Sequence, residues 1–131
     1  MGALDQAEAQ RLQNAHLGLA SYTAPTTPIM QRLMSSNGSA SSNGTQVTGG
    51  SYAAQSLSAA LPASSTNGSI STNAAISYTG MPATTTVGVE WWDSAGSPRR
   101  QAWGALSASK TTGAGDTLTV ASGSASENLN A

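Results

Sequence analysis

The clearest pattern along the chain is an alternation of side chains over residues 85–93. Apolar residues occupy every second position, namely Val87, Val89 and Trp91. The positions between them are Gly88, Glu90 and Trp92. Because successive side chains of a strand point to opposite faces, this pattern predicts a strand with one face against a core. Trp91 and Trp92 therefore cannot both enter the same core, and one of them is expected to face outward.

Shorter runs predict further strands separated by turns. The expected strands cover residues 29–34, 52–58, 73–78, 99–107, 117–121 and 124–129, with a short segment at 69–72 and a short extended piece at 16–22. The last two are expected to pair with each other around Ser122-Gly123. Asn-Gly pairs at 37–38, 43–44 and 67–68 mark turns, since both residues tolerate positive φ. Many short strands with frequent turns predict a mainly β fold, a small antiparallel β-sandwich or jelly-roll-like domain.

Residues 3–15 predict a helix. Ala, Gln, Leu and Arg are good helix formers, and Asp5 and Glu8 lie early, where the helix dipole favours acidic groups. We expect residues 1–22 to form an N-terminal helix or arm with a first extended segment, and residues 23–131 to form the β-sandwich domain. The helix could pack on its own domain or lie as an arm across a neighbouring subunit.

Composition limits the size of the core and the kinds of partner. Only 38% of the 131 residues are hydrophobic and there is no Phe, so a thin core helped by oligomerisation is expected. Charged residues make up 8% with a net charge of −1, which argues against binding to nucleic acid or to a membrane surface. There is no cysteine, no apolar run of membrane-spanning length and no secretory signal pattern, which favours a protein that is made and assembled in the cytoplasm.

The residues that could carry chemistry have simpler structural explanations. His16 is the only histidine and lies near no nucleophile motif of the Gly-x-Ser-x-Gly type. Asp93 and Asp116 lie in predicted turns, where aspartate bonds the local backbone. Glu90 could pair with Arg99 or Arg100 across the predicted hairpin. We therefore predict a protein that is not an enzyme, with no cofactor and no metal.

The candidate partner-binding residues are Leu4, Arg11 and Leu12 on the arm, together with Trp92 and Trp103. Interfaces favour Trp, Tyr and Arg, so the two tryptophans could lie at a subunit interface. They could also belong to the core, or stack on a glycan.

Two stretches of the chain resemble a known family. The first is residues 45–55, Thr-Gln-Val-Thr-Gly-Gly-Ser-Tyr-Ala-Ala-Gln, and the second is the ordered series 76–83, 87–93, 103–106 and 115–120. Together, over about residues 17–128, they are similar to small virion proteins of tailed phages that infect actinobacteria. Members are labelled tail fibre or minor tail proteins, and some relatives look like capsid decoration proteins. The resemblance implies a compact β domain without catalytic residues.

The expected function is that of a virion structural protein. The first expectation is a capsid decoration or minor capsid protein that binds the major capsid protein and copies of itself, as a trimer, on the capsid surface. The alternative is a tail fibre or minor tail protein used in host adsorption, for which a host surface glycan would be a partner.

Overall fold

The computed structural model describes residues 2–63 and 69–128, and its regular elements are mainly short antiparallel strands. The elements in chain order are β1 (Ala3–Leu4), α1 (Gln6–His16), β2 (Met30–Ser36), β3 (Thr45–Gln46), β4 (Gln55–Ser56), β5 (Ser69–Ser71), β6 (Ile76–Met81), β7 (Thr84–Trp92), β8 (Arg100–Thr112), β9 (Asp116–Val120) and β10 (Ser126–Asn128). In the described part of the chain, no helix is long and apolar enough to cross a bilayer.

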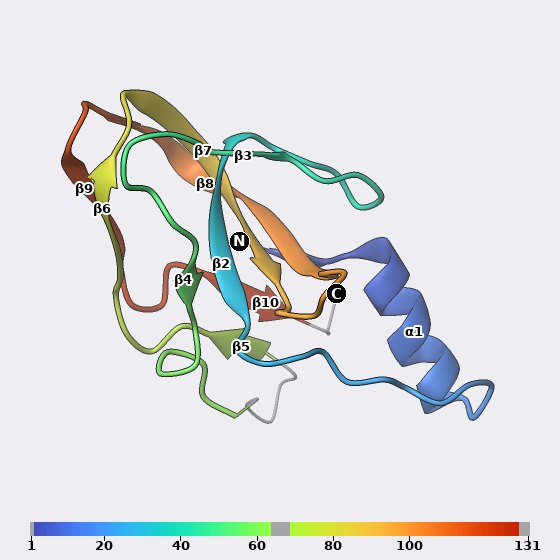
Figure 1. Ribbon diagram of the computed structural model, residues 1–131. Coiled ribbons are helices and arrows are strands. Elements are labelled where there is room, and N and C mark those ends of the chain that lie inside the picture. The colour runs from blue at the N-terminus through green and yellow to red at the C-terminus, as the bar shows by residue number, and fades with distance from the viewer. Residues whose placement is uncertain (1, 64–68, 129–131) are drawn as a thin grey trace.

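The largest sheet has six strands and forms one layer of the molecule. Its order is β1-β8-β7-β2-β3, and β4 also pairs with β2. The β7–β8 hairpin and the β2–β7 ladder are its longest pairings. The strands β6 and β9 pair in a second small sheet, and β5 pairs with β10 in a third. Figure 1 shows β6 and β9 on one side of the large sheet and α1 on the opposite side.

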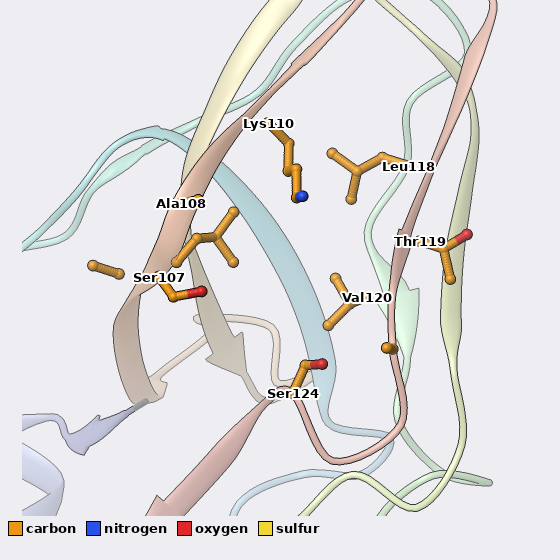
Figure 2. Close-up of a pocket in the computed structure, with 10 residues that line it drawn as sticks. Ser107, Ala108, Lys110, Leu118, Thr119, Val120 and Ser124 are labelled. Atoms are coloured by element: carbon orange, nitrogen blue, oxygen red, sulfur yellow. The ribbon is translucent and has the colours of Figure 1, made fainter.

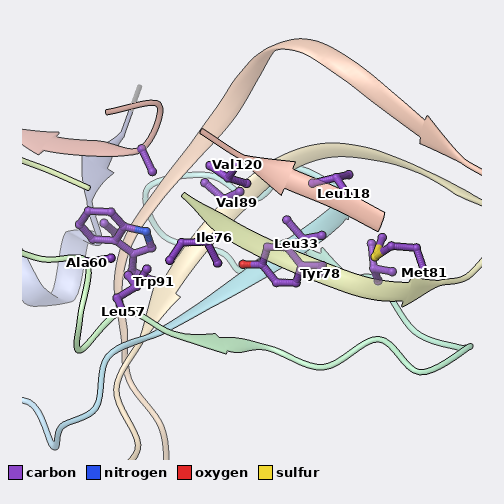
Figure 3. Packing of buried hydrophobic residues seen from close by; sticks show 13 residues of the cluster. Leu33, Leu57, Ala60, Ile76, Tyr78, Met81, Val89, Trp91, Leu118 and Val120 are labelled. Atoms are coloured by element: carbon purple, nitrogen blue, oxygen red, sulfur yellow. The ribbon is translucent and has the colours of Figure 1, made fainter. Parts of the chain in front are cut away.

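The hydrophobic core lies between the large sheet and the β6–β9 pair (Figure 3). Leu33 of β2, with Val89 and Trp91 of β7, points inward from the large sheet. Tyr78 of β6 and Leu118 of β9 pack against them from the other side. Leu33 and Tyr78 are almost fully buried, so the few large side chains of this composition are concentrated at one place.

Polar bonds inside the core tie the two sheets together. The Tyr78 hydroxyl donates to the main-chain oxygen of Gln31 at 3.1 Å, which links β6 to β2. The side chain of the same residue also takes part, because Oε1 of Gln31 accepts from the Trp91 indole nitrogen at 3.0 Å. Tyr52 stacks on Tyr78 with ring centroids 5.8 Å apart. Burial raises the pKa of the Tyr78 hydroxyl far above its ordinary value, so it remains a donor at any physiological pH.

The N-terminal segment begins as a strand, and the helix starts later than residue 3. Ala3 and Leu4 pair with Trp103 and Ala102 as an edge strand of the large sheet. Asp5 then caps α1, because its Oδ1 accepts from the main-chain nitrogens of Ala7 at 2.9 Å and of Glu8 at 3.4 Å. The cap fixes the start of the helix at Gln6.

The mainly β, antiparallel fold with a short N-terminal helix is confirmed, and several details differ from the prediction. Residues 17–22 form no strand, and the strand predicted over 52–58 is reduced to β4. The strands β9 and β10 do not pair with each other as predicted, since β9 pairs with β6 and β10 with β5. The turn predicted at 67–68 and the end of the strand predicted to reach 129 lie outside the described residues.

Candidate functional site

A β-bulge near the start of β8 determines which side chains share the outer face of the large sheet. Ala102 pairs with Trp91, but the next partner of β7 is Arg100 opposite Trp92, so Gln101 is the extra residue. Without the bulge, Arg100 would point toward the core like Ala102. With it, Arg100 lies on the outer face, where Trp103 is opposite Glu90.

Arg100 is the centre of a buried polar network. Its guanidinium contacts Oε1 of Glu90 at 3.0 Å and Oδ2 of Asp5 at 2.8 Å. The same group donates to the main-chain oxygens of Ser42 at 2.7 Å and Ala40 at 3.2 Å, in the loop between β2 and β3. The Arg100 and Glu90 side chains are each only 2% exposed. One arginine thus joins the sheet, the helix cap and this loop.

Glu90 is fully engaged within the same network. Its Oε1 also accepts from the main-chain nitrogen of Gly44 at 2.7 Å, and its Oε2 accepts from the Trp92 indole nitrogen at 2.9 Å. A buried carboxylate is stable only when it is paired and hydrogen-bonded in this way. The predicted pairing of Glu90 with an arginine across the hairpin is confirmed, with Arg100 as the partner.

A second cluster holds the body of α1. Glu8 is 1% exposed and pairs with Arg11 at 3.0 Å and more loosely with Arg99 at 3.9 Å. The Tyr22 hydroxyl also donates to Glu8. Burial, together with this bond and the Glu8 charge, raises the pKa of Tyr22 to about 12. The hydroxyl therefore stays protonated and continues to donate to the carboxylate.

Asp93 fixes the turn that leads from β7 toward β8. It accepts from the main-chain nitrogens of Arg99 at 2.7 Å and Thr26 at 3.2 Å. Burial alone would raise the pKa of Asp93, but these bonds and the Arg99 charge hold the pKa below its ordinary value. The prediction that Asp93 and Asp116 bond the local backbone in turns is confirmed, since Asp116 accepts from the main-chain nitrogen of Gly113 at 2.7 Å.

The structure places the five predicted partner-binding residues in two settings. Leu4 is half-buried in β1, while on α1 Leu12 is half-buried and Arg11 is exposed. Trp92 and Trp103 are half-buried on the outer face of the large sheet. Arg32 lies 4.3 Å from the Trp92 ring centroid, and Arg100 lies 5.9 Å from that of Trp103. Arginines of the same chain therefore cover part of both indole rings.

The sequence pattern did not identify the residues that dock the helix. Asp5 and Glu8 looked only like favourable charges early in a helix, and Tyr22 lay in a segment predicted to be extended. Their common signal was the Arg99-Arg100 pair, because two adjacent cations in a chain with six acidic residues need partners. Nothing in the sequence showed that those partners were 91 to 95 positions away.

Five acidic residues form structural hydrogen bonds or salt bridges rather than gathering around an open site, namely Asp5, Glu8, Glu90, Asp93 and Asp116. Within residues 2–63 and 69–128, no three Asp, Glu or His side chains are placed to hold a metal ion. Among these described residues, the indole nitrogen of Trp103 is buried and has no hydrogen-bond partner. The arrangement can fix the N-terminal segment and the connecting loops to the sheet.

A groove of the surface lies open between the two layers (Figure 2). It has a volume of about 370 Å³ and lies between β8 and β9. Leu106 and Ala108 of β8, with Leu118 and Val120 of β9, supply apolar lining, and Lys110 supplies a charge. Figure 2 shows the Lys110 side chain directed from β8 into the space beside Leu118. The groove is thus a second feature, separate from the polar network.

Comparison with known proteins identifies a family whose model matches most of the chain. No curated protein matches the chain. The model of the family described as "Podophage GP4 fiber I protein gp80" matches residues 3–127, which include β1, the whole of α1, both groups of polar contacts and the groove. The match bears out the expected relation to phage virion proteins at the level of the family. The chain belongs to this podophage fibre protein family, a family of phage virion structural proteins.

Proposed function

We propose that the chain is a structural subunit of a phage fibre that acts by binding other virion proteins, without enzymatic activity. The observation that carries this proposal is the family match over residues 3–127, whose printed description names a fibre protein. This favours the tail-fibre alternative over capsid decoration, which was the first expectation from the sequence.

The polar network supports a structural role. Asp5, Glu8, Glu90 and Asp93 are all used to hold the helix, the β2–β3 loop and the hairpin in place. These salt bridges and hydrogen bonds make the domain rigid, because moving any one element would leave a buried charge unpaired. A rigid module suits a part that must present fixed surfaces to its neighbours in a particle.

The tryptophans favour contact with protein over contact with a sugar. A glycan would stack on a free indole face, whereas Arg32 and Arg100 already lie against Trp92 and Trp103. Half-buried Trp beside Arg is a composition enriched in protein interfaces. We therefore place Trp92 and Trp103 at or near a subunit contact, with a host glycan as the other candidate partner.

The test is to locate the chain in intact virions by cryo-electron microscopy, with an antibody fragment against the chain as the marker. Fibre-associated density that fits the β domain, and marker bound along the fibres, is the expected result. Density and marker distributed over the capsid shell would overturn the fibre proposal and restore the decoration hypothesis. Marker on neither would show that the chain is not part of the mature particle.

A glycan-array measurement distinguishes a fibre subunit that binds only other proteins from one that also binds a host glycan. We expect no host-surface glycan to be retained by the chain. Saturable retention that is lost in Trp92→Ala would contradict the assignment of this tryptophan to a protein contact. Thr79→Ala is the control, since this exposed side chain lies on β6, in the other layer of the fold, and its replacement leaves the outer face of the large sheet unchanged.

A further inference from the structure

The turn that ends α1 exposes two leucines. Leu17 is 60% exposed and Leu19 is 73% exposed, and they are the large apolar side chains left exposed in residues 2–63 and 69–128. A single exposed leucine is ordinary, but two on one projecting turn form an apolar tip. Figure 1 shows this turn at the far end of α1, away from the sheets.

The apolar tip is held in a fixed shape. The main-chain nitrogen of Leu17 donates to Gln13 at 3.0 Å, and that of Leu19 donates to Asn14 at 2.8 Å. Gly18 lies between them with a φ of +73°, which a side chain would disfavour. The two leucines are therefore presented without the ordering cost that a mobile loop would add to binding.

The groove between β8 and β9 also has apolar lining. Its apolar lining includes Leu106, Leu118 and Val120, and its volume is about 370 Å³. It stays open because four residues of β8, numbers 106–109, face only Val87 of β7 across an irregularity in the ladder. The groove therefore opens beside the half-buried Leu106, while Leu118 and Val120, each only 6% exposed, also belong to the core.

Charge also matches between the tip and the groove. Lys110 lines the groove and forms no salt bridge within the described residues. The main-chain carbonyls at the end of an 11-residue helix carry partial negative charge, which attracts a cation within about one turn. A tip that entered the groove would bring the end of α1 close to the Lys110 ammonium.

From these observations we propose that the Leu17–Leu19 tip of one copy docks into the β8–β9 groove of a second copy. The turn after α1 and the strand β9, whose residues line the groove, lie on opposite sides of the molecule (Figure 1), so the contact joins two different surfaces. Such a head-to-tail contact closes into a ring when the rotation between copies permits it, and otherwise continues as a filament. The proposal goes beyond the proposed function, because it concerns contact between copies wherever the chain sits in the virion.

Directed cross-linking tests the contact, because the natural chain has no cysteine. One preparation carries Leu19→Cys and a second carries Ala108→Cys, and the two are mixed under mild oxidation. We expect a disulfide-linked pair containing one chain of each kind. The matched control replaces Ala108→Cys with Ala59→Cys, another exposed position outside the groove, and should give little mixed product. Equal yields in both mixtures would overturn the proposal.

Sedimentation equilibrium gives an independent measurement of self-association. The double change Leu17→Ser and Leu19→Ser should weaken association by about tenfold or more, and Lys110→Glu should weaken it less. The control Ala20→Ser, on the same exposed segment, should leave it unchanged. The replaced side chains are all exposed, so the variants should remain folded, which circular dichroism checks. A natural chain that stays monomeric at its highest soluble concentration, or an oligomer indifferent to these changes, would overturn the proposal.

Discussion

Gly88 shows how one absent side chain makes room for the polar network. A Cβ at this position of β7 would lie 1.9 Å from Oδ1 of Asn37 and 2.7 Å from the main-chain oxygen of Gly104. Asn37 begins the loop that carries the Arg100 contacts at Ser39, Ala40 and Ser42. The loop can lie close to the sheet only because β7 has a glycine there.

Gly88→Ala should therefore destabilise the fold by about 1–3 kcal/mol, since either the loop or β8 must move. Gly96→Ala is the matched control, because nothing lies within 4 Å of its Cβ position, and its effect should stay within about 0.5 kcal/mol. Urea denaturation of both variants measures the difference. Equal effects at the two sites would show that the Asn37 loop adapts freely.

Glu127 gives the fold a dependence on pH. Burial, reinforced by repulsion from Glu8, raises the pKa of this β10 carboxyl from 4.5 to about 7. Between these values the folded state holds a proton that the unfolded state has lost, so the Glu127 contribution to stability falls as pH rises from about 4.5 to about 7. The contribution is fully present below this window.

Glu127→Gln should remove this loss of stability at high pH, because glutamine carries no ionisable proton. Because the side chain is partly exposed, solvent reduces the effect, and we expect the variant to be more stable than the natural chain by about 1 kcal/mol at pH 8 and nearly equal to it at pH 4.5. Thermal unfolding across this range measures the difference. Parallel pH profiles for the two proteins would contradict the raised pKa.

At the scale of elements, α1 is attached through charges more than through apolar packing. Its buried position is Glu8, and its cap Asp5 bonds to Arg100 on β8. Arg100→Ala would leave Glu90 buried without its cation, so we expect a loss of about 3–5 kcal/mol in the free energy of unfolding. Hydrogen exchange in α1 should rise at the same time.

Arg11→Ala is the matched control for that change. Arg11 also pairs with a glutamate at 3.0 Å, but its side chain is 42% exposed, and its removal should cost about 1 kcal/mol or less. Chemical denaturation of both variants, with hydrogen exchange read on the helix, compares them. If Arg11→Ala proved as costly as Arg100→Ala, burial would not be the source of the network's strength.

The sequence predicted elements well where a local pattern was sufficient. The alternation at 85–93 correctly placed Val89 and Trp91 on one face of the strand and Trp92 on the other, but it did not decide which tryptophan enters the core, and the structure buries Trp91. It could not predict the bulge at Gln101, which depends on the pairing of two strands. The single inserted residue reverses the direction of Arg100 and so decides the whole polar network.

At the scale of the whole molecule, the composition predicted a thin core and the structure explains how it is supplemented. Large side chains such as Leu33, Tyr78 and Trp91 are gathered between the large sheet and the β6–β9 pair, while Arg100 joins distant segments on the outer face. Which strands would form the second sheet could not be predicted, because short polar strands carry little information about their partners. The β6–β9 pairing joins residues about 40 positions apart.

Self-association would also make stability depend on concentration. If copies bind through the Leu17–Leu19 tip, the midpoint of thermal unfolding should rise as protein concentration increases, because binding favours the folded state. The Leu17→Ser and Leu19→Ser double variant should show a midpoint that is nearly independent of concentration. Differential scanning calorimetry at several concentrations measures this, and a flat response in the natural chain would count against association through the tip.

The burial of the Arg100–Glu90 pair has a consequence for the salt tolerance of the molecule. Dissolved ions weaken attractions between charges that water can reach, and they act much less on a pair that is only 2% exposed on both sides. Concentrated salt should therefore leave Arg100 in position to hold the helix cap Asp5, which is itself only 13% exposed, while it loosens the exposed Arg11 contact. The N-terminal helix can therefore remain in place at both low and high ionic strength.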